Sequence, residues 1–246
     1  MNQAPSFVPL SAFSPLTFTF RILERDFVGV AGPLFVAALI GQLQWIVLGM
    51  GVLDNAVAAL TLLVAWIPVG SWCTAGMLRF SLKAARGQGY GYRDLWLVDA
   101  SVLQLVLLEL VVCVGIAATW LVCAITMSRE GAAEDGWFAS VPSLAPALGT
   151  AGQVVVALAL VVFWLVALTR AAIAPVLIVD ARMGVFRALA RSVTLTRGNS
   201  GAIFLYGIII GLIGGLSGTM FGGAALSALS APGIVYVGLA VRGELV

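Results

Sequence analysis

The chain has 246 residues, of which 61% are hydrophobic and only 10% are charged, with a net charge of +2 and no histidine. A soluble domain carries about 25% charged residues, so this chain has too few charges to cover a soluble surface. Several apolar runs of about 20 residues indicate membrane-spanning helices instead. The composition therefore predicts an all-α, polytopic membrane helical bundle, and no nucleic-acid partner is expected.

The first 26 residues are expected to form an N-terminal interfacial segment, followed by a single transmembrane helical domain over residues 27–246. Ser14 and Pro15 suit the start of a helix. Apolar residues then recur at helical spacing, at Leu16, Phe20, Leu23 and Phe27. This pattern predicts an interfacial helix leading into the first span. A short strand over LTFTF is the alternative, but it would leave backbone groups unpaired beside a bilayer.

Six transmembrane helices are expected from the apolar runs. The first four cover approximately residues 27–49, 56–79, 99–127 and 153–179. The glycine-rich stretch 202–241 is expected to form the last two, with a turn near residues 217–223. Two helices of about 17 residues would just cross a hydrocarbon core of about 30 Å.

The distribution of charge predicts the orientation of these spans. Most Lys and Arg residues lie in the loops after the second and fourth runs, whereas the loop after the third holds Arg129 with Glu130, Glu134 and Asp135. Basic loops stay in the cytoplasm. We therefore expect a multi-pass protein of the bacterial inner (cytoplasmic) membrane with both the N- and C-termini cytoplasmic. A five-span alternative would place Arg242 outside.

The stretch from Ala174 to Gly201 carries the strongest local pattern. On a helix, Val185, Phe186, Leu189 and Val193 share one face, and Arg187 and Arg191 lie opposite. This predicts a basic amphipathic cytoplasmic helix between helices 4 and 5, in contact with the anionic headgroups of the lipid bilayer. The expected cytoplasmic basic face comprises Lys83, Arg86, Arg93, Arg182, Arg187, Arg191 and Arg197.

Two ionisable residues are expected deep inside the membrane. Glu109 lies ten residues past Asp99, and Arg170 lies ten residues before Asp180. Both would sit roughly 15 Å from the inner interface, where charged groups pair or face a cavity. We predict a buried ion pair between them, serving either to fix helix register or to couple ion movement. The further polar intramembrane residues are Gln42, Gln44 and Gln104.

Glycines repeat every four residues in the last apolar stretch, a spacing that permits close helix packing. The alternatives are a contact between copies of the chain and a thin gate. The expected helix-packing residues are Gly207, Gly211, Gly215, Gly218 and Gly222. No catalytic residue, metal site or cofactor is expected, because histidine is absent and the three cysteines are scattered.

The runs PVLIVD (Pro175–Asp180) and ALARSVTLTRG (Ala188–Gly198) resemble the signature of an uncharacterised bacterial family of six-helix integral membrane proteins. That family is similar to the membrane domain of glycerophosphoryl diester phosphodiesterases. The resemblance implies a fold and a membrane location. Because this sequence contains no catalytic phosphodiesterase domain, it does not imply lipid hydrolysis. Gly184 lies between the two runs, and the matching residues are Pro175, Asp180, Ala188, Leu189, Arg191, Ser192, Leu195 and Gly198.

Three functions are compatible with these patterns. The first is a non-enzymatic integral inner-membrane subunit that acts as a scaffold, with a protein partner or as a homo-oligomer. The alternative is a transporter or channel-like subunit for a small solute, ion or lipid, whose path would use Gln42, Gln44, Glu109 and Arg170. A membrane enzyme acting on lipid is the third, and it would need a headgroup-sized pocket beside Asp180, Arg182 and Arg191.

Overall fold

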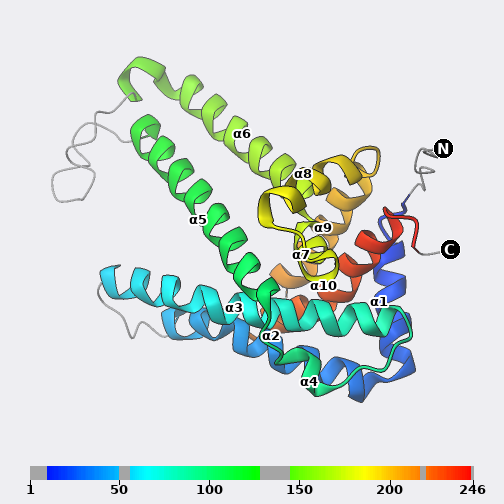
Figure 1. Ribbon diagram of the computed structural model, residues 1–246. Helices are drawn as coiled ribbons and strands as arrows, with labels where there is room; N and C mark the ends of the chain where they lie inside the picture. Colours follow the sequence, from blue (N-terminus) through cyan, green and yellow to red (C-terminus); the bar gives the residue numbers. More distant parts are fainter. Residues whose placement is uncertain (1–9, 50–55, 128–144, 217–219, 245–246) are drawn as a thin grey trace. The chain divides into compact units, whose positions relative to one another are not determined.

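The computed structural model describes residues 10–49, 56–127, 145–216 and 220–244. Within these ranges it leaves the side chains of residues 42, 44–49, 56–60, 63, 120, 124, 145–148, 211, 213–216 and 220–226 undescribed. Every element in the described ranges is an α-helix, as predicted (Figure 1). The helices are α1 (Ser14–Arg25), α2 (Phe27–Gly49), α3 (Ala56–Ala85), α4 (Tyr92–Leu95), α5 (Ala100–Met127), α6 (Ala145–Ala171), α7 (Ala174–Ala181), α8 (Val185–Leu195), α9 (Ser200–Leu216) and α10 (Met220–Ala240).

The helices follow the predicted apolar runs, with three differences. Helix α6 begins at Ala145, ahead of the predicted start of the fourth run. Helix α3 continues through Pro68 and ends at Ala85, beyond the predicted end of the second run. The fourth run is divided, because α6 ends at Ala171 and α7 begins at Ala174 with Pro175 in its first turn. Proline lacks the backbone N–H that an uninterrupted helix needs, which explains why a new helix starts there.

Two stretches of the described residues are long and apolar enough to cross a membrane. They are Ala100–Cys123 and Gly149–Ala181, each with a mean hydropathy of 2.5. A third crossing results if α8 and the first part of α9 form one broken span, bent by 108°. Phe27–Gly41 and Ser227–Ala240 are apolar but shorter. The chain thus carries apolar helices suited to a membrane, and the six-span topology stays a prediction.

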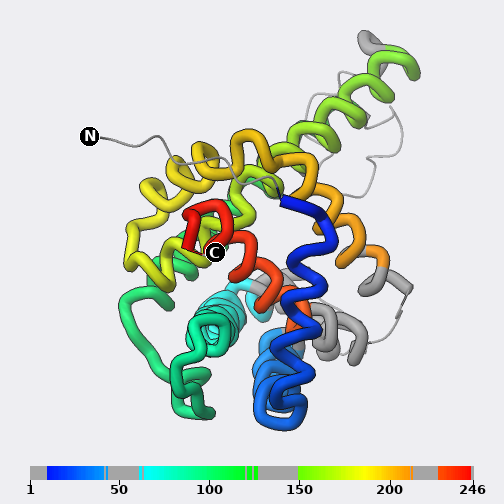
Figure 2. Tube along the Cα trace, turned by 90° about the vertical axis from the view of Figure 1, so that its right-hand side faces the viewer, coloured from blue at the N-terminus to red at the C-terminus, as the bar shows by residue number. Residues whose placement is uncertain are grey.

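The chain forms two compact units. Unit 1 comprises residues 1–108 and 169–246, and unit 2 comprises residues 109–168, the remainder of α5 and α6. In unit 1, α1 lies along α10 and also contacts α2 (Figure 2). The predicted interfacial position of α1 and the single transmembrane domain over residues 27–246 stay predictions.

Helix α7 lies in the core of unit 1. Its side chains Val176, Leu177 and Ile178 are at most 1% exposed. A helix that is apolar on all sides is stable only when it is surrounded by protein or lipid. Here the surrounding residues come from α3, the start of α5, α8, α9 and α10, and they include Ala75, Leu78, Leu82, Leu105, Val185, Ala188, Ile203, Val235 and Leu239.

Glycine allows three close contacts between the helices of unit 1. A Cβ atom at Gly76 in α3 would meet the backbone carbonyl of Leu95, the last residue of α4. At Gly233 in α10 it would meet the hydroxyl of Tyr206, and at Gly238 it would lie 2.9 Å from the side chain of Val176. Unit 1 is therefore packed most tightly where α3, α7 and α10 meet their neighbours.

Unit 2 has little buried surface of its own. The indole Nε1 of Trp164 donates to Oγ1 of Thr119 at 2.8 Å, and Gly115 leaves room for the same ring. Along the two helical segments many large apolar side chains are exposed, among them Val114, Ile116, Leu121, Leu158, Val161, Val162, Phe163 and Leu165. Exposed apolar side chains around a helix are typical of a lipid-facing surface.

Replacing Gly76 by alanine is expected to destabilise the protein by about 1–3 kcal/mol, because the obstructing atom belongs to the backbone and a methyl group forces the chains apart. The matched control is Gly207→Ala in α9, where nothing described lies within 4 Å of the new Cβ atom. There alanine should be neutral or stabilising by up to about 1 kcal/mol. Unfolding in detergent micelles measures the stability of both variants. Equal changes in the free energy of unfolding would contradict the close packing at Gly76.

Candidate functional site

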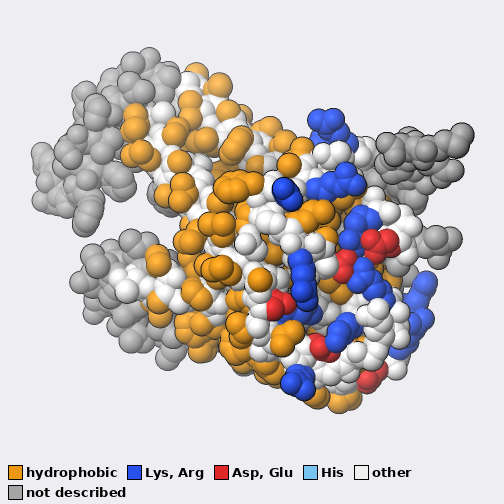
Figure 3. Space-filling view, viewed as in Figure 1, with side chains coloured by type: hydrophobic (Ala, Val, Ile, Leu, Met, Phe, Trp, Pro, Cys, Tyr) orange, Lys and Arg blue, Asp and Glu red, His pale blue; other side chains and the backbone are white. Residues whose placement is uncertain are grey.

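Charged side chains gather at one end of unit 1, where helices α3, α4, α7 and α10 begin or end. Figure 3 shows Lys, Arg, Asp and Glu side chains interspersed over this unit. Among the described residues they form six ion pairs, contributed by Arg79, Lys83, Arg86, Asp94, Asp99, Asp180, Arg242 and Glu244. We call this group the polar end.

Asp180 is shared by two arginines. Arg86 forms a bidentate pair with it, with Nη1 2.6 Å from Oδ1 and Nη2 2.8 Å from Oδ2. Nη2 of Arg242 lies 2.7 Å from Oδ2, and Glu244 contacts both guanidinium groups. Asp180 is only 12% exposed, so these contacts are partly shielded from water. The pairs join the ends of α3, α7 and α10 and leave no net charge.

The second part of the polar end joins α3 to the segment before α5. Arg79 pairs with Asp99 at 2.8 Å, and Lys83 pairs with Asp94 at 2.6 Å. Partial burial raises the pKa of Asp99, but the hydrogen bonds from Ser101 and the charge of Arg79 outweigh it, so the net pKa is lowered. Asp94 shows the same balance, with Lys83 and a backbone N–H lowering its pKa. Both carboxyl groups therefore stay ionised at neutral pH.

The side of α8 that is buried by protein includes only part of the predicted apolar face. Val185, Ala188 and Ser192 are buried, whereas Phe186 is 71% exposed and Val193 is 39% exposed. Of the predicted apolar face, Val185 is covered by protein, whereas Phe186 and Val193 are not. Small residues at positions 188 and 192 let α8 approach α7 closely, which turns the larger apolar side chains outward.

Short hydrogen bonds hold α8 in this orientation. Ser192 is fully buried, and its hydroxyl donates to the backbone carbonyl of Arg170 at 2.6 Å. At the other end, the backbone N–H of Val185 donates to Oε1 of Gln104 at 3.2 Å. These contacts satisfy a helix-terminal carbonyl and a helix-terminal N–H that would otherwise lack partners.

The exposed arginines around α8 differ from those of the polar end. Arg182, Arg187, Arg191 and Arg197 are all exposed, and none forms an ion pair with a carboxylate in the described ranges. Arg93 in α4 is exposed in the same way. Of the predicted basic face, only Lys83 and Arg86 have carboxylate partners here. The unneutralised positive charge thus concentrates on α8 and the turns beside it.

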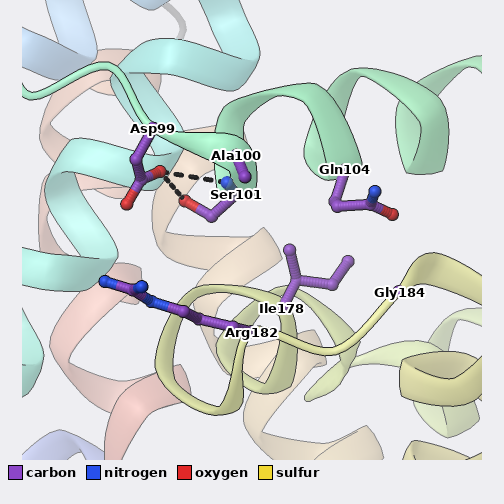
Figure 4. A pocket seen from close by; sticks show the side chains of 7 residues that line it. All are labelled: Asp99, Ala100, Ser101, Gln104, Ile178, Arg182 and Gly184. Atoms are coloured by element: carbon purple, nitrogen blue, oxygen red, sulfur yellow. Dashed lines mark hydrogen bonds between the residues drawn. The ribbon is translucent and has the colours of Figure 1, made fainter.

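A pocket of about 150 Å³ lies between the start of α5 and the turn before α8. Figure 4 shows the side chains from α5 on one side, opposite those of α7 and the following turn. It is lined by Asp99, Ala100, Ser101, Gln104, Ile178, Arg182 and Gly184. The pocket predicted for a lipid-acting enzyme would lie beside Asp180, Arg182 and Arg191, and of these only Arg182 lines the observed one.

The pocket is suited to binding rather than to proton transfer. A general base works best with a pKa near neutrality. Asp99 is the only carboxyl group among the residues that line the pocket, and its lowered pKa makes it a weak base. The arrangement supplies a guanidinium group and an amide, which recognise anions and hydrogen-bonding groups.

The predicted intramembrane residues are distributed across the structure. Gln104 lies in unit 1 and links α5 to α8 through its side-chain amide. Glu109 belongs to unit 2 and Arg170 to unit 1, so their ion pair stays a prediction. The side chains of Gln42 and Gln44 lie outside the described residues.

The predicted glycine repeat is largely untested by the described residues. Gly207 is exposed, with no described atom within 4 Å of a Cβ built on it. The surroundings of Gly211, Gly215, Gly218 and Gly222 lie outside the description, so their close packing stays a prediction.

Sequence reasoning missed the charge cluster around Asp180. Asp180, Arg86 and Arg242 are separated widely in the sequence, yet each lies at or just beyond the C-terminal end of a helix. Charged residues that end helices on the same side of a membrane lie at the same level, so their shared sidedness was the available signal.

Replacing Asp180 by asparagine is expected to destabilise the protein by about 1–3 kcal/mol, because two guanidinium groups lose a charged hydrogen-bond acceptor. Glu244→Gln is the matched control; Glu244 is 40% exposed, and a pair at that exposure contributes about 0–1 kcal/mol. Reversible unfolding in detergent micelles measures both variants. Asp180→Asn must have the larger effect, and the reverse order would contradict a central role for Asp180.

Comparison with known protein families, curated proteins and solved structures finds no match to this chain.

Proposed function

We propose that this chain is a non-enzymatic integral subunit of the bacterial inner membrane, and that it acts as a scaffold holding a protein partner at the cytoplasmic surface. The observation that carries the proposal is the exposed side of α8. It combines Phe186 and Val193 with the four exposed arginines at positions 182, 187, 191 and 197.

The angle between α8 and α9 supports a position along the membrane surface. The chain bends by 108° between α8 and the first part of α9, so the two helices are close to perpendicular. If α9 crosses the bilayer, α8 lies roughly parallel to its surface. In that position Phe186 enters the headgroup–acyl boundary, as the apolar side of an interfacial helix does.

The charges support the cytoplasmic side. Each Lys or Arg near an anionic leaflet contributes about 1 kcal/mol of attraction. Arg187 and Arg191 are four residues apart on one side of α8 and repel each other unless an anion lies between them. Anionic headgroups supply that anion, and an acidic protein surface can reach the arginines that point away from the lipid.

The ion pairs of the polar end support a scaffold rather than a moving part. Arg86 and Arg242 hold Asp180 from two different helices, and α8 is hydrogen-bonded at both ends. A surface fixed in this way presents its arginines in one arrangement, which lowers the ordering cost of binding a partner.

The position of α8 relative to the membrane can be measured with nitroxide labels. The three native cysteines are first replaced by alanine, and one label is then attached at Phe186→Cys. Thr194→Cys is the matched control. Thr194 is exposed on the more polar side of the same helix. In anionic vesicles the label at position 186 should be relaxed mainly by oxygen, and the label at 194 mainly by a water-soluble nickel chelate. Equal access of the nickel chelate to both labels would exclude the interfacial position.

The scaffold role can be tested by copurification from the native membrane in mild detergent. A stoichiometric partner should accompany the wild-type chain and be reduced at least about tenfold by Arg187→Glu with Arg191→Glu, because like charges then oppose the partner. Arg21→Glu with Arg25→Glu makes the same charge change at exposed positions of α1 and should retain the partner. The absence of any stoichiometric partner, or equal losses in both variants, would refute the proposal.

A further inference from the structure

We infer that the pocket beside Arg182 binds the phosphate group of an anionic phospholipid. This inference rests on the membrane location in the proposed function but not on the protein partner. All residues that line the pocket belong to unit 1, so the site is formed within one compact body.

The charge balance of the pocket favours an anion. Asp99 already accepts hydrogen bonds from Arg79 at 2.8 Å and from the backbone N–H of Ser101 at 3.0 Å, so its charge is compensated. Arg182 also lines the pocket and has no carboxylate partner among the described residues. Asp99 and Arg182 are the charged residues of the lining, and their charges cancel. Arg79 pairs with Asp99 without lining the pocket, so the three residues together carry a net charge of +1.

Gln104 supplies neutral donors in the same pocket. Its Oε1 atom accepts the N–H of Val185 at 3.2 Å, which orients the side-chain amide with its NH₂ group still able to donate. Guanidinium and amide groups both donate, and a phosphodiester has acceptor oxygens but no donor. Figure 4 shows the guanidinium group of Arg182 toward the Asp99 end of the pocket and the amide of Gln104 toward the Gly184 end. A cavity of about 150 Å³ has room for a phosphate group and not for a folded peptide segment.

The backbone at Arg182 is a second, independent observation. This residue ends α7 in the left-handed region, with φ 51° and ψ 36°, and its N–H donates to the carbonyl of Leu177. It is the only non-glycine residue with positive φ in the described ranges. Glycine adopts this conformation without steric cost and is the usual residue at such a helix end. An arginine there is explained if its side chain contributes to binding.

The position of the pocket at the ends of two apolar stretches indicates that the phosphate belongs to a lipid. The apolar stretch Ala100–Cys123 begins at the pocket, and the apolar stretch Gly149–Ala181 ends beside Arg182. Two helices suited to the hydrocarbon core thus change to polar residues at this point. In a bilayer, that boundary is where the phosphate groups lie.

The test uses the purified full chain in a neutral detergent, with unfolding followed by intrinsic tryptophan fluorescence. Phosphatidylglycerol, diacylglycerol with the same acyl chains, glycerol phosphate and inorganic phosphate are added at constant ionic strength. The variants are Arg182→Gly, which suits the left-handed backbone, and Arg182→Asn, a second neutral residue that tolerates it. Arg187→Gln is the matched control, an exposed arginine that does not line the pocket.

Phosphatidylglycerol should raise the Tm of the wild type and of Arg187→Gln, and diacylglycerol should not. Both Arg182 variants should fold and need about 10- to 100-fold more phosphatidylglycerol for the same shift, because a charged hydrogen bond is lost. A wild-type response in these variants, or an equal response to diacylglycerol, would overturn the site.

The remaining outcomes separate the inference from the proposed function. If Arg187→Gln loses the response as fully as Arg182→Gly, headgroups bind the exposed side of α8, and the pocket assignment is wrong although α8 is interfacial. If glycerol phosphate or inorganic phosphate acts at the same concentration as the lipid, the ligand is a soluble phosphate and the lipid assignment is overturned. If the lipid response is as expected but no partner copurifies, the scaffold role fails alone.

Discussion

The sharing of one carboxylate by two arginines holds the polar end of unit 1 together. Asp180 lies in the last turn of the buried helix α7, and Arg86 and Arg242 reach it from just beyond the ends of α3 and α10. A carboxylate that is only 12% exposed requires such partners, since an unpaired buried charge is strongly unfavourable. The pairing therefore links the ends of three helices at one point, beside the apolar core that surrounds α7.

This arrangement divides the basic residues into two groups with different roles. Arg79, Arg86 and Arg242 are neutralised by carboxylates and hold helices together. Arg182, Arg187, Arg191 and Arg197 surround α8, are exposed, and have no carboxylate partner among the described residues. Ion pairs within the first group satisfy charge locally, whereas the second group is available for headgroups and a partner. The proposed scaffold function and the proposed phosphate site both use this second group.

Helix α8 shows why periodicity alone does not identify a buried face. A helical pattern states which side chains share a side, but not whether that side meets protein or lipid. Phe186 and Val193 are exposed, whereas Val185, Ala188 and Ser192 are buried. The small side chains pack because they bring the backbone of α8 close to α7 and to the carbonyl of Arg170. The hydrophobic pattern therefore identifies a shared apolar side but not what covers each of its residues.

From the sequence alone, the helical class, the positions of the helices and the location of the basic segment could be determined. These depend on local composition, such as the length of apolar runs, proline and glycine positions, and the clustering of arginine between runs. Only the tertiary structure decided that Asp180 pairs with Arg86 and Arg242 and that Arg182 lines a pocket with Gln104. Those contacts join residues far apart in the chain, and their distances depend on how α3, α5, α7 and α10 pack. No local pattern contains that information.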